Sequence, residues 1–208
     1  MILLDEFDVL VIVGGWNKHI FSRDWVSRYL LPNETLEVEI PVNVDGSQRI
    51  SSEKVRVAVL GNRLIFTSRK SNDEILEFVQ GLGLKTADYL PHTPVSAFGI
   101  NFLFQNTINE SLSKILQLND NESLGKLGAK IRTTTIRRQL ELDNRLINFG
   151  VSADNEKITF DFNFNFSISN LVEFKEKISD NQIVDLKRIA LDIVTNTYGY
   201  SLSTAEGA

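Results

Sequence analysis

The chain has 208 residues, of which 42% are hydrophobic and 24% are charged, a composition typical of a folded globular protein. It contains no cysteine, which excludes disulfide bonds, thiolate metal ligands and cysteine nucleophiles. Its 22 basic and 27 acidic side chains give a net charge of −5, which argues against a general binder of polyanions, because such proteins usually present a strongly basic face.

The first residues do not fit an export signal, since Asp5, Glu6 and Asp8 stand where a signal peptide needs apolar side chains. The longest aliphatic run, residues 9–13, is far shorter than the roughly 20 residues that span a bilayer. We therefore expect a cytoplasmic protein that makes no membrane contact.

The first half of the chain predicts a strand, a helix, three strands and a second helix. Ser22 is a typical N-cap, and Pro32 ends the helix that follows it. Gly61-Asn62 is a hairpin turn, because both residues tolerate a positive φ. The expected elements are a strand over 7–13, a helix between Ser22 and Pro32, strands over 35–43, 54–60 and 63–68, and a helix that begins with a capping box at 71–74.

The second half predicts the same order of elements. Capping boxes begin at Thr107 and Asn170, and the helix after the second one is expected to break near Asp180. The expected elements are a strand over 95–105, a helix from 107, strands over 131–142, 145–152 and 157–168, and helical segments from 170 to about 194.

This order predicts an α+β protein made of two β-α-β-β-β-α units, residues 1–90 and 91–200, followed by a flexible tail at 201–208. Strands joined mainly by hairpins form an antiparallel sheet, so we expect one extended sheet with helices on one face. In the order of its elements, though in no residue motif, the chain resembles the duplicated fold of the TATA-box-binding protein family. That resemblance implies a curved sheet.

Residues 157–168 carry the clearest pattern, because a Phe stands at every second position from 160 to 166. Burying one Phe contributes roughly 1.5–3 kcal/mol, so this face must lie in the core. The opposite face is rich in amides and hydroxyls and low in charge, and an earlier strand repeats the theme, with Asn101 and Asn148 as further members. The candidate binding face consists of Thr133, Thr135, Arg137, Gln139, Asp161, Asn163 and Asn165. An alternative interpretation of the same residues is a solvated sheet face without a ligand.

A second candidate is a pocket at the turn after the first strand, with Trp16, His19 and Asp24. Gly14-Gly15 lies where phosphate-binding loops occur, but the spacing of a dinucleotide fingerprint is missing. Only two histidines exist, His19 and His92, and neither belongs to a metal-binding motif. The sequence thus predicts no catalytic, cofactor-binding or metal-ligating residue.

We therefore expect a non-enzymatic binding or assembly protein that meets a protein partner or another copy of itself through the open face or an edge of its sheet. Two alternatives stay open. One is a nucleic-acid binder that uses the curved sheet and the basic residues between Arg132 and Arg145, although the net charge does not favour it. The other is a small-molecule binder or enzyme with a pocket near Trp16.

Overall fold

The computed structural model describes residues 1–40, 48–107, 121–154, 156–180 and 182–200. They form a mixed α+β structure around one antiparallel sheet of ten strands. The strands are β1 (Ile2–Leu3), β2 (Asp8–Gly14), β3 (Glu37–Glu39), β4 (Arg49–Ser51), β5 (Val55–Leu60), β6 (Arg63–Ser68), β7 (Val95–Thr107), β8 (Thr134–Leu142), β9 (Arg145–Ala153) and β10 (Lys157–Ser167). The helices are α1 (Arg23–Trp25), the π-helix η1 (Val26–Leu30), α2 (Asp73–Tyr89), α4 (Asn121–Lys126), α5 (Leu171–Asp180) and α6 (Ile183–Tyr198).

The strand order is β3-β4-β5-β6-β2-β7-β10-β9-β8, and β1 pairs with β7 beside this path. In the first half of the chain, β2 pairs with the last strand of its own stretch, β6. In the second half, β7 likewise pairs with the last strand, β10. The two halves meet where β2 pairs antiparallel with β7, so the sheet is continuous from β3 to β8.

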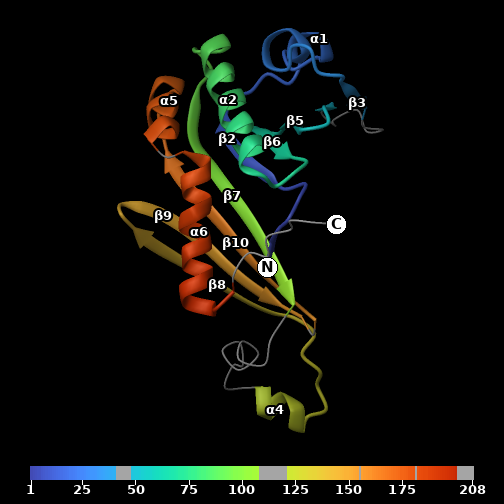
Figure 1. Cartoon of the computed structure of the whole chain (residues 1–208), viewed down its shortest axis with the longest axis vertical. Coiled ribbons are helices and arrows are strands. Elements are labelled where there is room, and N and C mark those ends of the chain that lie inside the picture. Colours follow the sequence, from blue (N-terminus) through green and yellow to red (C-terminus); the bar gives the residue numbers. More distant parts are fainter. Residues whose placement is uncertain (41–47, 108–120, 155, 181, 201–208) are drawn as a thin grey trace.

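The core is built on the two longest strands, which lie side by side in Figure 1. Phe160 of β10 stands opposite Phe104 of β7, and Phe162 stands opposite Phe102. All four rings are fully buried, as the alternating sequence predicts. Phe149 of the neighbouring strand β9 packs on Phe162, with 4.7 Å between the ring centroids. These pairs fix the register of β7, β9 and β10.

Helices α2 and α6 cover this core, and Figure 1 shows both in front of the strands. α2 contacts β2 and β6, α6 contacts β7 and β10, and the two helices contact each other. The N-cap of α2 is Asn72, whose side chain accepts a hydrogen bond from Ile75 N, and not Ser71, where the predicted capping box begins. α6 ends at Gly199, whose φ of 72° is in the left-handed region that glycine favours. None of the described helices has the length and apolar character to cross a membrane.

One predicted strand differs from the structure, and one strand of the structure was not predicted. Within residues 35–40, the described part of the strand expected over 35–43, the paired residues are Glu37–Glu39, and Ile40, expected on the core face, is 74% exposed. Among the described strands, β3 is the last of the sheet. Its partner is β4, a strand of three residues, which is too short for the alternation of apolar and polar residues to be recognised in the sequence.

The remaining differences concern helices and element ends. Ser22 caps the first helix as predicted, but Leu31 N donates to Val26 O, so the helix continues as a π-helix. The second strand of the second half begins at Thr134 and not at residue 131. A short helix, α4, lies in the polar stretch before it. The helix expected from Thr107, the tail at 201–208 and the end of strand 35–43 lie outside the described residues.

Candidate binding face of the sheet

The alternation along β10 turns Asp161, Asn163 and Asn165 away from the phenylalanine core. Asp161 and Asn165 are exposed, and Asn163 is half-buried between its neighbours. The same alternation on β8 and β9 adds Gln139 and Asn148, both exposed. We call this side of β7, β10, β9 and β8 the polar face.

Four amide side chains form a hydrogen-bonded row across the polar face, one from each strand. Gln139 Nε2 donates to Asn148 Oδ1 at 3.2 Å, and Asn148 Nδ2 donates to Asn163 Oδ1 at 2.9 Å. Asn163 Nδ2 then donates to Asn101 Oδ1 at 2.7 Å. The strand register creates this row, because it places these four residues directly opposite one another. We call these residues the amide row.

The hydrogen bonds of the amide row all run in one direction, because the backbone carbonyl at its end can only accept. Asn101 Nδ2 donates to the backbone carbonyl of Asp8 on β2, at 2.6 Å. A carbonyl can only accept, so Asn101 must turn its NH₂ toward Asp8 and its oxygen toward Asn163. For the same reason, Asn163 turns its NH₂ toward Asn101 and its oxygen toward Asn148, and Asn148 turns its NH₂ toward Asn163. Each of these inner amides uses one N–H and one oxygen lone pair within the row, which leaves a second N–H and a second lone pair for another molecule.

Two glycines make room for this arrangement. A Cβ at Gly99 would stand 2.6 Å from Asn163 Nδ2, so only a glycine leaves space for that amide. Gly150 lies between Arg137 and Asp161 in the register and carries no side chain to fill the space between them. A depression of about 540 Å³ lies here. Its lining residues are Arg137, Arg138, Gln139, Asn148, Phe149, Gly150, Asp161 and Asn163.

Arg137 and Asp161 are residues of opposite charge that line this depression from the strands on either side of Gly150. Although the Asp161 side chain is exposed on the polar face, desolvation by the surrounding chain raises its pKa, and the positive charge of Arg137 partly opposes that shift by lowering it. The raised pKa means that folding disfavours the ionised carboxylate, so a ligand that donates a hydrogen bond to it would relieve a cost already present.

The predicted members of the candidate face divide into a centre and a margin. Arg137, Gln139, Asp161 and Asn163 line the depression. Thr135 is exposed beside it, and its hydroxyl lies 3.1 Å from that of Ser152. Thr133 precedes β8 and is exposed, and Asn165 is exposed on β10 between Gly99 and Leu146.

The sequence interpretation missed the two glycines of the face and the Asp8 carbonyl that ends the amide row. A glycine inside a strand, such as Gly99 or Gly150, indicates a close approach of another group and was the available signal. No sequence signal marked the Asp8 carbonyl, because its role depends on which strand lies beside β7.

The alternative pocket looks different in the structure. Trp16 is buried, and its indole N–H donates to Ile12 O at 2.8 Å, so this side chain is part of the core. It lines a depression of about 380 Å³ together with residues 89–94. His19 and Asp24 are exposed and do not line this depression.

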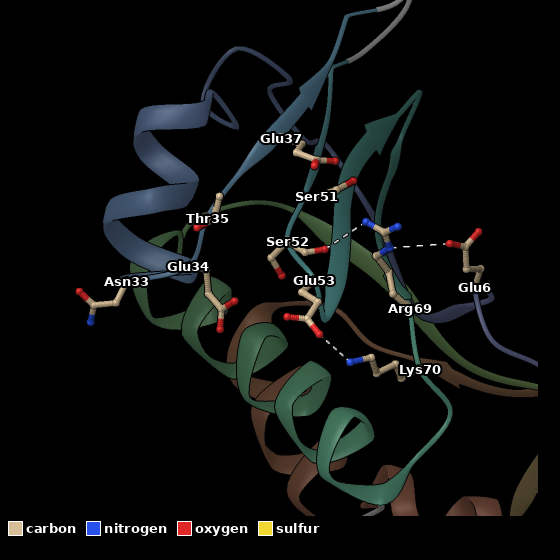
Figure 2. Close-up of a pocket in the computed structure, with 10 residues that line it drawn as sticks. All are labelled: Glu6, Asn33, Glu34, Thr35, Glu37, Ser51, Ser52, Glu53, Arg69 and Lys70. Carbon is tan, nitrogen blue, oxygen red and sulfur yellow. Dashed lines mark hydrogen bonds and ion pairs between the residues drawn. The ribbon is translucent and has the colours of Figure 1, made fainter. Parts of the chain in front are cut away.

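A third depression, of about 560 Å³, lies beside β4 and β6 and is shown in Figure 2. Four of its charged side chains form two pairs: Arg69 Nε lies 3.7 Å from Glu6, and Lys70 Nζ lies 2.7 Å from Glu53. Arg69 also donates to the carbonyl of Ser52. In the described part of the chain, no group of three or more His, Asp and Glu side chains could hold a metal ion.

The basic residues between 126 and 145 do not share one surface. Alternation along β8 puts Arg137 on the polar face and Arg138 on the opposite side. Lys126 pairs with Glu122 at 2.7 Å, and Arg145 lies 3.8 Å from Asp143. A nucleic-acid footprint requires a continuous basic stripe, which these positions do not form.

Comparisons with models of protein families, with curated proteins and with solved structures found no match to this chain. The geometry of the polar face is therefore the basis of the function proposed below.

Proposed function

We propose that this protein is a non-enzymatic binding protein whose polar face docks a protein partner through hydrogen bonds. The observation that carries the proposal is the amide row from Gln139 to Asn101, which is already aligned by its own hydrogen bonds. Binding normally costs side-chain entropy at the interface, roughly 0.5–1.5 kcal/mol for each side chain that becomes fixed. In the amide row, hydrogen bonds already hold the side chains in place before a partner binds, so less side-chain entropy is lost on binding.

The chemistry of the face favours a protein partner over the two alternatives. Its groups are amides, hydroxyls and two residues of opposite charge, Arg137 and Asp161, which match the N–H and C=O groups of polypeptide. A nucleic acid would demand an excess of positive charge, and Arg137 faces Asp161 across Gly150. An enclosed small-molecule site is usually lined by apolar residues, whereas six of the eight residues that line this depression are charged or carry an amide.

We also propose that residues 1–90 and 91–200 are two related units, in which the β-α-β-β-β-α order of the first is interrupted by the short strand β4, and that their joined sheets leave the polar face uncovered by helices. The support is that β2 pairs with β6 and β7 pairs with β10, so the first strand of each stretch lies beside its last. An experimental structure tests this proposal by superposition of residues 7–84 on 95–194. Different strand directions in the two stretches would refute it.

The binding function can be tested with a variant confined to inner strands. Asn148→Ala, Asn163→Ala and Asn165→Ala together remove amides from β9 and β10 and leave the edge strand β8 unchanged. We expect the tagged variant to stay folded with a thermal unfolding midpoint lowered by several degrees, because it loses the hydrogen bonds of the amide row but no apolar contact of the core. It should lose the proteins that the wild type recovers from a lysate of the source cells.

The matched control is Lys18→Ala, His19→Ala and Arg23→Ala, three exposed residues near the turn after β2. This control should recover the same proteins as the wild type. If the control loses them and the amide variant keeps them, the binding surface lies at the turn and the proposal is wrong.

A further inference from the structure

Strand β8 ends the sheet, and no strand in the described part of the chain pairs with its outer edge. It is a long edge of nine residues, and it contains no proline or bulge that would prevent pairing with another strand. Edge strands of this kind are sites where a further strand can add. Its residues on the polar face, Arg137, Gln139 and Glu141, are all exposed.

The turn after β8 shows which backbone groups face outward. Asp143 and Asn144 have φ values of 49° and 61°, as in a two-residue hairpin turn with both residues left-handed. In such a hairpin the flanking residues, here Leu142 and Arg145, exchange both backbone hydrogen bonds. Since these groups alternate along a strand, Arg137, Gln139 and Glu141 direct their N–H and C=O groups away from β9.

We propose that β8 pairs antiparallel with β8 of a second copy of this chain, with Gln139 opposite Gln139 on the two-fold axis. The side chains select this register. Pairing centred on Arg137 or Arg138 would place identical guanidinium groups opposite each other, which destabilises a sheet. Pairing centred on Leu140 would place Arg137 opposite Asp143, which lies beyond the end of the strand, and would leave Glu141 opposite Gln139 without an arginine partner.

Centred on Gln139, the register places Arg137 opposite Glu141 of the second copy, once on each side of the axis. On the other side of the sheet, Ile136 stands opposite Leu142 of the second copy, and this leucine is 40% exposed in the single chain. A two-fold interface is self-complementary, and an arginine and a glutamate four positions apart around a central amide satisfy that condition.

The pairing would also extend the amide row, which ends at Gln139 in a single copy. Gln139 is the last member of the amide row, and it donates inward to Asn148. Opposite its own copy, each Gln139 meets an amide with a free lone pair and a free N–H. The two rows would then join into one, and the two polar faces would lie on the same side of a doubled sheet. This inference uses the edge of the sheet and stands whether or not the polar face binds a partner.

Because the chain has no cysteine, one engineered cysteine reports the register directly. Residues that form a hydrogen-bonded antiparallel pair have Cα atoms about 5.5 Å apart, within the range that a disulfide spans. Gln139→Cys should therefore form a disulfide-linked dimer under mild oxidation. Thr135→Cys, exposed on the same side of the same strand, should stay monomeric on a non-reducing gel, because it stands opposite Asp143 of the second copy.

Charge exchange tests the same register without a covalent bond. Sedimentation equilibrium of the wild type should give twice the chain mass of 23.5 kDa at sufficient concentration. Arg137→Glu and Glu141→Arg should each raise the dissociation constant about tenfold or more, since each change places like charges opposite each other twice. The double variant should restore the dimer, and Arg132→Glu, an exposed residue before β8, should leave it unchanged.

A wild type that stays monomeric at millimolar concentration would overturn the inference. So would a dimer in which Thr135→Cys crosslinks and Gln139→Cys does not, or one that both single charge variants leave intact.

Discussion

Asn163 is the residue on which the polar face is centred. It accepts from Asn148 and donates to Asn101, so it connects the strands on both of its sides. Phe162, directly before it, is fully buried against Phe104 and Phe149. The core residue sets the position of the backbone, and the backbone sets the position of the amide, which is how packing on one side of the sheet determines chemistry on the other.

Gly99 and Gly150 provide a matched test of this residue-level account. A Cβ at Gly99 would meet Asn163 Nδ2 at 2.6 Å, whereas a Cβ at Gly150 would lie at an ordinary 3.5 Å from Asp161 Cβ. We expect Gly99→Ala to displace the Asn163 amide and break its hydrogen bond to Asn101, at a cost of about 0.5–1.5 kcal/mol in unfolding free energy. Gly150→Ala should be neutral or slightly stabilising.

Chemical denaturation measures the two costs, and the side-chain NH₂ signals in a ¹⁵N-correlated NMR spectrum report the amide row. Signals of Asn163 and Asn101 should move in Gly99→Ala and stay in place in Gly150→Ala. Equal changes in both variants would show that the row does not depend on the space above Gly99.

Helix α5 depends on a capping arrangement that titrates. The Glu173 carboxylate accepts from Ser169 N at 2.9 Å and lies 2.8 Å from Lys177 Nζ, while Glu173 N donates to Asn170 Oδ1. The hydrogen bond from Lys177, followed by those from Ser169, lowers the pKa of Glu173 from an ordinary 4.5 to about 2. A carboxylate with a lowered pKa stabilises the fold above its unfolded pKa, and this contribution is lost as the pH falls toward the folded value.

We therefore expect Glu173→Gln to lower the unfolding free energy at neutral pH, with a difference from wild type that shrinks as the pH falls from 4.5 to 2. Urea denaturation at a series of pH values measures this difference. Glu176→Gln, an exposed change on the same helix, is the control and should alter the pH profile less. A Glu173→Gln difference that is constant across this range would contradict the capping role.

At the level of elements, the prediction from the sequence was most accurate where apolar and polar side chains alternate or where typical turn residues separate two strands. The strands 145–152 and 157–168 match β9 and β10 within a residue, because a Phe at every second position leaves one register. Short elements without a period, such as β4, could not be recognised. The predicted break near Asp180 agrees with the separate helices α5 and α6.

The candidate face could be predicted only in part, because alternation gives the side of a strand and not its neighbours. Asn163 and Asn101 are 62 residues apart in the sequence and meet because β10 returns beside β7. Hairpins predict the neighbours β8–β9 and β9–β10, since these strands are consecutive. The β7–β10 pairing follows from tertiary packing of the phenylalanine rows, which no local signal reveals.

At the level of the whole molecule, the two sides of the sheet differ in chemistry. One side carries the phenylalanine core and the helices α2 and α6, which contact β2, β6, β7 and β10. The other side carries the polar face with the amide row and the depression beside Gly150. The continuous pairing from β3 to β8 links both halves of the chain into one support, so the position of the amide row depends on residues from both halves.

The most direct test of the central claim follows the amide row itself during binding. The ¹⁵N-labelled full chain is titrated with the partner recovered by the wild-type protein, and the side-chain NH₂ signals of Gln139, Asn148, Asn163 and Asn101 are followed. The polar face predicts that these signals shift or broaden at the titration equivalence point, while the Trp16 indole signal stays unchanged. Unchanged amide signals together with a shifted indole, or with shifts confined to Arg69 and its neighbours, would contradict the account.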